Sequence, residues 1–125
     1  MEVESREAFK RAIEILIVLL SDCLTSVGAP VEELQQEIAE AVKIVIDIYG
    51  ESIFTINPGL LAAAMCVAII KQKYDYMAPT VIKIVARALG VSDKALKKRV
   101  RKIEKLIQTQ RESRSGPRQT SSWRR

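Results

Sequence analysis

Residues 58–70 read Pro58-Gly59-Leu60-Leu61-Ala62-Ala63-Ala64-Met65-Cys66-Val67-Ala68-Ile69-Ile70. Proline is favoured in the first turn of a helix, so this stretch predicts a helix from about Pro58 to about Lys73. From Leu60 onward such a helix is apolar on every face, and a helix of that kind must be buried all round. Its alanines let neighbouring helices approach closely. We therefore expect a central helix around which the rest of the chain packs.

Glycines and prolines divide the rest of the chain into four further segments with apolar periodicity. These are the predicted helices over residues 5–27, 31–49, 80–89 and 92–108. Residues 109–125 are rich in Ser, Arg and Gln, and they cannot bury enough apolar surface to fold alone. We expect an all-α fold, in which a five-helix domain over residues 1–108 is followed by a flexible basic tail over residues 109–125.

Composition narrows the class of function. The chain has 125 residues, which suits one domain with a real core, and it contains no His. Without His the common catalytic triads cannot form, and the commonest metal ligand is missing. The five glycines are scattered and form no phosphate-binding loop. We therefore expect neither an enzyme nor a protein that holds a cofactor or a metal.

The two cysteines, Cys23 and Cys66, lie in apolar runs and are predicted to be small core residues. They are too few and too far apart for a zinc site, whereas a disulfide between them is neither required nor excluded. The most hydrophobic run, residues 15–20, is far shorter than a membrane span and lacks the flanks of a signal peptide. We expect a soluble protein of the reducing cytoplasm, with no membrane as partner.

The net charge of +5 conceals an uneven distribution along the chain. Residues 1–93 hold 8 basic and 13 acidic residues, or −5, whereas residues 94–125 hold 12 basic and 2 acidic residues, or +10. Such asymmetry favours a polyanionic partner, with nucleic acid ahead of an acidic membrane surface. The alternative is a tail that only improves solubility.

Residues 80–103 have the pattern of a helix-turn-helix. Ala86 is small where the two helices would cross, and Gly90 lies at the turn, where a positive φ is often needed. Ser92 fits the N-cap of the second helix. That helix would expose a basic face, which favours nucleic-acid binding over a plain helical hairpin with a solvated surface.

The chain resembles a single cyclin-type repeat, most nearly the second repeat of archaeal and eukaryotic transcription factor IIB. The resemblance covers roughly residues 31–107, and these residues carry it: Pro58 to Ala68, Thr80, Ile84-Val85-Ala86, Leu89-Gly90-Val91-Ser92 and Leu96-Lys97-Lys98-Arg99-Val100. Val100 replaces the family's usual aromatic residue, and the chain lacks both the zinc ribbon and room for a second repeat. The resemblance implies a DNA-binding transcription regulator or an initiation-factor-like protein, without polymerase recruitment by a ribbon.

By this resemblance the second helix of the helix-turn-helix contacts double-stranded DNA. The implied contact residues are Ser92, Lys94, Lys97, Lys98, Arg101, Lys102 and Lys105. Lysines mainly supply sequence-independent affinity for phosphate, whereas arginine can grip guanine with two hydrogen bonds. Arg101 is therefore the predicted base-reading residue. Asp93 is expected to cap the helix rather than to repel phosphate.

The tail is expected to follow the phosphate backbone through Arg111, Arg114, Arg118, Arg124 and Arg125. Trp123 either stacks on a base or is simply exposed, and exposure is the commoner state of a lone tail tryptophan. A tail that binds RNA by itself is a further interpretation of the same residues.

The predicted first helix carries more apolar side chains than one core-facing stripe requires, among them Ile15 to Leu20. One interpretation is a homodimer interface, so that two chains supply two repeats. The other is that the helix is simply buried. The apolar helix and the acidic body also suit a protein-interaction module of the transcription machinery, which is the alternative to DNA binding.

Overall fold

The computed structural model describes residues 2–120, and these residues form five α-helices and no strand. The helices are α1 (Glu2–Ser26), α2 (Gln35–Tyr49), α3 (Pro58–Lys73), α4 (Ala78–Leu89) and α5 (Asp93–Thr120). Short 3₁₀ turns lie before α2, after α2 and before α4; they are η1 (Glu32–Leu34), η2 (Gly50–Thr55) and η3 (Asp75–Met77). The predicted all-α, five-helix architecture is confirmed.

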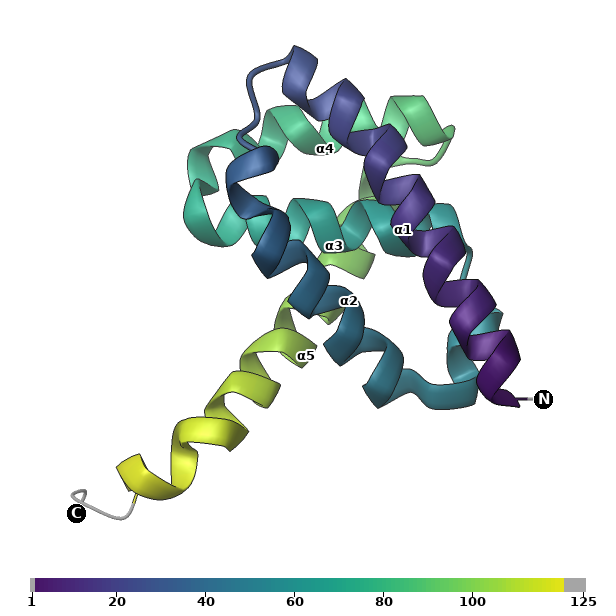
Figure 1. The fold of residues 1–125 in the computed structure, drawn as a ribbon. Helices are drawn as coiled ribbons and strands as arrows, with labels where there is room; N and C mark the ends of the chain where they lie inside the picture. Colours follow the sequence, from purple (N-terminus) through teal and green to yellow (C-terminus); the bar gives the residue numbers. More distant parts are fainter. Residues whose placement is uncertain (1, 121–125) are drawn as a thin grey trace.

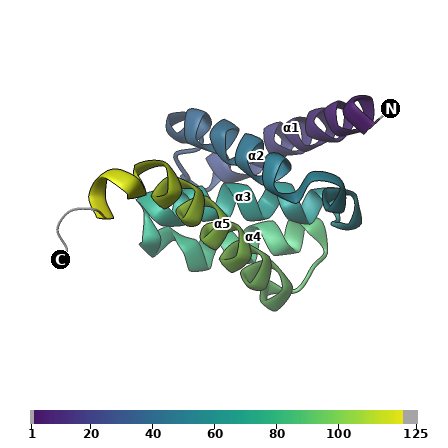
Figure 2. The same ribbon diagram turned by 90° about the horizontal axis from the view of Figure 1, so that it is seen from below.

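Helix α3 lies at the centre of the molecule, as its composition predicts. Figure 1 shows α3 in the middle of the helices, and in Figure 2 it lies between α1 and α2 on one side and α4 and α5 on the other. All ten side chains from Leu61 to Ile70 are buried. The helix begins at Pro58, and the side chain of Asn57 accepts hydrogen bonds from the backbone N–H groups of Gly59 and Leu60 at 2.8 and 3.1 Å. These two bonds satisfy donors that have no partner inside the helix.

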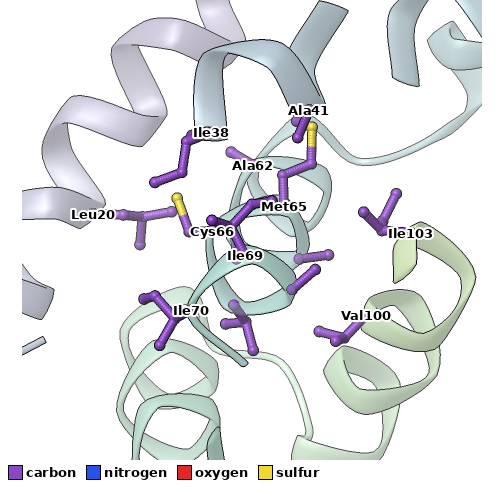
Figure 3. Close-up of a cluster of buried hydrophobic side chains, with 14 of the residues drawn as sticks. Leu20, Ile38, Ala41, Ala62, Met65, Cys66, Ile69, Ile70, Val100 and Ile103 are labelled. Atoms are coloured by element: carbon purple, nitrogen blue, oxygen red, sulfur yellow. The ribbon is translucent and has the colours of Figure 1, made fainter. Parts of the chain in front are cut away.

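The core consists of side chains from the other helices packed on α3. Figure 3 shows Leu20 of α1, Ile38 of α2 and Ile103 of α5 approaching Met65 and Cys66 from different directions. The small alanines of α3 leave room for these larger residues, because a helix surface of methyl groups permits short distances between helix axes. The buried side chains are all apolar among the described residues.

Several helix bounds differ from the sequence-based expectation; α1 begins at Glu2 rather than at residue 5, and α4 begins at Ala78 rather than at residue 80. Helix α2 begins at Gln35 rather than Val31, because η1 forms the turn after Pro30. The short connection between the helices expected over residues 31–49 and 58–73 is mostly the 3₁₀ turn η2. Helix α5 continues to Thr120 instead of ending near Gln108. The apolar periodicity of α5 ends at Ile107, but the helical backbone continues beyond that residue. In the next turn, the Gln108 side chain donates a hydrogen bond to the Glu112 carboxylate at 3.4 Å.

Helix α1 is buried on one face only. Its side chains at Ile13, Leu20 and Leu24 are buried, whereas Ile15, Val18 and Leu19 are 62, 63 and 61 % exposed. The interpretation that this helix is simply buried is therefore wrong for the isolated chain. None of the helices in the described part of the chain is long and apolar enough to cross a bilayer.

The two cysteines lie in different environments, and both are free thiols. Cys66 is fully buried in α3, as predicted. Cys23 is only half-buried, because it lies toward the edge of the buried face of α1. The prediction that both are core residues therefore holds for Cys66 alone.

Candidate nucleic-acid interface

Helices α4 and α5 are joined by a turn of three residues, 90–92. Gly90 has φ = 72°, a left-handed conformation that glycine adopts without steric cost. The N–H of Val91 donates to the carbonyl of Ala86 at 3.0 Å, which satisfies a carbonyl at the end of α4. The side-chain oxygen of Ser92 accepts from the N–H of Ala95 at 3.0 Å. The predicted helix, turn and helix are thus present, with the predicted glycine and cap in place.

The cap at the start of α5 comes from Ser92 and not from Asp93. Asp93 is the first residue of α5, so its side chain is too late in sequence for the N-cap position. The expectation that Asp93 caps the helix is therefore wrong, although its negative charge still favours the positive end of the helix dipole. Ser92 is also a predicted DNA contact; it is exposed, but its side-chain oxygen is already engaged in the cap.

Helix α5 has an apolar side and a basic side. The apolar side consists of Leu96, Val100, Ile103 and Ile107, each at most 2 % exposed. The opposite side, which we call the basic face of α5, consists of exposed cationic side chains: Lys94, Lys97, Lys98, Arg101, Lys102 and Lys105. Residues spaced by three, four and seven positions lie on one side of a helix, which explains how the same segment forms both surfaces.

No residue of the basic face of α5 forms a salt bridge with any residue that the structure describes. Six cations along about 16 Å of one rigid helix repel one another, and the repulsion decreases when an anion binds. The apolar side anchors the helix to α3 and α4, so the charges are held in position without a partner. This surface is therefore suited to an extended polyanion.

A shallow cleft adjoins the basic face where α5 crosses the end of α3 and the start of α4. Lys97 and Arg101 line it from α5, together with Lys71 of α3, Asp75 of η3 and Pro79 of α4. Lys71 is not among the residues predicted for the interface. The sequence indicates that Lys71 lies in the last turn of α3, but it does not indicate which helix lies beside that turn. Only the packing of α3 against α5 brings Lys71 beside Arg101.

The predicted tail contacts are only partly within the described structure. Arg111 is exposed and its Nη1 donates to the side-chain oxygen of Gln72 at 3.3 Å, so this arginine contacts the folded body. Arg114 and Arg118 lie on the last turns of α5, without a described side chain. Trp123, Arg124 and Arg125 lie outside the described residues.

The chain matches no protein-family model, no curated protein and no solved structure. The described residues also contain no group of three or more His, Cys, Asp or Glu side chains that could hold a metal ion. The functional interpretation therefore depends on the geometry and charge of the chain itself.

Proposed function

We propose that this chain binds double-stranded DNA through the basic face of α5 and acts as a small transcription regulator built on one cyclin-type repeat. The observation that supports this proposal is a row of six exposed cations, without ion-pair partners among the described residues, on the outer side of a helix whose inner side is anchored in the core. An α-helix of this kind fits the major groove, where its side chains reach phosphates and base edges.

The residues of the basic face are proposed to play two roles. The lysines bind phosphates and supply affinity for any DNA sequence. Arg101, near the middle of the face, is the residue proposed to read a base, because a guanidinium group can donate two hydrogen bonds to guanine. Lys71 also lines the cleft beside Arg101, but its charge is paired with the Glu104 carboxylate at 3.3 Å, so the cations of the basic face supply the positive potential.

The experiment that tests the proposal compares two triple variants of equal charge loss. Lys97, Lys98 and Arg101→Ala removes three cations from the basic face. The matched control, Arg6, Lys10 and Lys43→Ala, removes three cations from α1 and α2, on the other side of α3. We expect the first variant to bind a mixed-sequence DNA duplex at least about tenfold more weakly at moderate salt, and the control to bind like the unchanged chain.

Two further measurements separate this proposal from its alternatives. The slope of log affinity against log salt should become shallower by about 1 for each phosphate that the variant no longer neutralises. Removal of residues 109–125, which follow Ile107, the last buried residue among the described side chains of α5, should leave DNA binding in place. If that removal abolished all binding to DNA and RNA, the tail would be the binding site and the proposal for α5 would be wrong.

The protein-interaction alternative is favoured by a different observation, the exposed apolar side chains of α1. An adaptor would retain a partner protein after nuclease treatment and would bind no duplex in the assay above. The normal binding of DNA by the α5 triple variant would likewise overturn the first proposal.

A further inference from the structure

Helix α1 carries a solvent-facing row of residues that we call the α1 stripe. Its members are Ala8, Arg11, Ile15, Val18, Leu19 and Asp22, all of them exposed. They are spaced by three and four positions, so they share one side of the helix, opposite the buried Ile13, Leu20 and Leu24. Three large apolar side chains more than 60 % exposed on one helix face are unusual for a surface that meets only water.

The two ends of the α1 stripe carry opposite charges. Arg11 lies toward the N-terminus of the stripe and Asp22 toward its C-terminus, with Ile15, Val18 and Leu19 between them. Neither charge forms a salt bridge with a residue that the structure describes. They lie eleven positions apart, which corresponds to about 16 Å along the helix.

This order of charges makes the stripe complementary to itself in one orientation only. When two copies of α1 lie antiparallel about a two-fold axis between positions 15 and 18, position 11 of each copy lies opposite position 22 of the other. Each arginine then faces a carboxylate, and the three apolar side chains of each copy cluster at the axis. In a parallel arrangement Arg11 would face the partner's Arg11 and Asp22 would face the partner's Asp22, so like charges would repel.

We infer that a second copy of this chain covers the α1 stripe in an antiparallel homodimer, with Arg11 of each copy paired to the partner's Asp22. Apolar burial supplies the attraction and the charges set the orientation. The contact is small, and association costs translational and rotational freedom, so we expect reversible exchange with monomer. Because α1 and α5 lie on opposite sides of α3, the dimer leaves both copies of the basic face free. The inference does not rest on DNA binding.

Sedimentation velocity of the full chain over a concentration series tests this inference. The unchanged chain should show a monomer–dimer equilibrium, and Val18→Glu should be monomeric while its helical circular dichroism is unchanged. Arg11→Asp and Asp22→Arg each turn two attractive pairs into repulsive ones, so each should raise the dimer dissociation constant about tenfold. The double variant Arg11→Asp with Asp22→Arg should restore it, because the pairs are re-formed with their signs exchanged.

The matched control is Lys83→Asp, which makes a comparable charge reversal at an exposed position on α4 and should leave dimerisation unchanged. A chain that stays monomeric at every concentration would overturn the inference. So would single charge reversals that have no effect, or a double variant that is not restored. The last measurement is binding to vesicles of equal parts phosphatidylcholine and phosphatidylserine. If the chain is monomeric and binds these vesicles, and Val18→Glu abolishes that binding, the α1 stripe contacts a lipid surface and the dimer inference is wrong.

Discussion

Lys71 of α3 and Glu104 of α5 form a salt bridge, with the Nζ and Oε1 atoms 3.3 Å apart. Glu104 is one of only two acidic residues after position 93. The carboxylate binds Lys71 of α3 and the side chain is only 23 % exposed, so Glu104 does not neutralise the outer side of α5. The positive charge of the basic face therefore depends both on the number of basic residues and on the position of the Glu104 carboxylate, which is paired with Lys71 of α3.

Replacement of Glu104 by Gln should lower the free energy of unfolding by about 0.5 kcal/mol, because a partly exposed ion pair contributes little after screening. The loss should shrink at high salt. Urea unfolding of Glu104→Gln, Lys71→Met and the double variant isolates the pair as a coupling energy. DNA affinity should not decrease in Glu104→Gln, since every cation of the basic face remains; a clear decrease would place Glu104 in the interface.

Replacing a buried alanine of α3 by a larger residue should destabilise the fold more than replacing one of its larger residues by another of similar volume. Ala63 is fully buried among neighbouring helices, so Ala63→Leu should destabilise the domain by about 1–3 kcal/mol through overpacking. Met65→Leu keeps nearly the same volume and should cost less than about 1.5 kcal/mol. Chemical denaturation of both variants measures the difference. Equal and small effects would mean that α3 is less tightly enclosed than its burial indicates.

At position 90 there is space for a methyl group, but the backbone conformation is unfavourable for a residue that carries one. A Cβ at this position would meet no atom within 4 Å, yet the φ of 72° is unfavourable for alanine. Gly90→Ala should therefore cost about 1 kcal/mol of stability, and Gly90→Asn should cost less, because asparagine adopts the left-handed conformation more readily. Thermal unfolding followed by circular dichroism compares the two. A neutral alanine would show that the turn relaxes to another conformation.

The thiol of Cys66 should make stability depend on alkaline pH. Burial raises its pKa from 9.0 to about 12, so the folded chain keeps the proton that the unfolded chain loses above pH 9. The contribution of this thiol to the free energy of unfolding is fully present below pH 9 and decreases as the pH rises from 9 to about 12. At pH 10 the decrease should be about 1.4 kcal/mol.

The check is the free energy of unfolding at pH 8 and pH 10 in Cys66→Ala and in the unchanged chain. We expect Cys66→Ala to be less stable than the unchanged chain at pH 8. Its free energy of unfolding should decrease less between pH 8 and pH 10 than that of the unchanged chain. The hydrogen bond from the Tyr74 hydroxyl to Glu33 raises the pKa of that hydroxyl too, so a Tyr74→Phe background removes a second alkaline contribution. A thiol reagent should modify Cys23 before Cys66 in the folded chain, because only Cys23 is partly exposed.

Local signals along the chain predict most of the fold. Pro58 marks the start of α3, Gly90 the end of α4 and Ser92 the cap of α5, because each acts through its own backbone or through a bond a few residues away. The apolar period of α5 likewise predicts its buried side and its basic face. The same period does not predict the end of α5, because a helical backbone needs no apolar period to continue past Ile107.

The candidate site is predictable in part for the same reason. Lys94 to Lys105 share a helix face whatever the helix packs on, whereas Lys71 joins them only because α3 passes beside α5. The sequence places Arg111 in a free tail, but this arginine contacts Gln72, which is distant in sequence. Contacts of this kind join residues tens of positions apart, and no local pattern encodes them.

Sequence periodicity is therefore sufficient to establish an all-helical chain, a fully apolar central helix and a basic last helix, because these are properties of single segments. It does not show which side of α1 meets the core, since apolar residues occur on more than one side of that helix. The packing of Ile13, Leu20 and Leu24 against the body settles this and leaves Ile15, Val18 and Leu19 in solvent. A helix can bury only the side that its neighbours reach, and the positions of those neighbours depend on the whole chain.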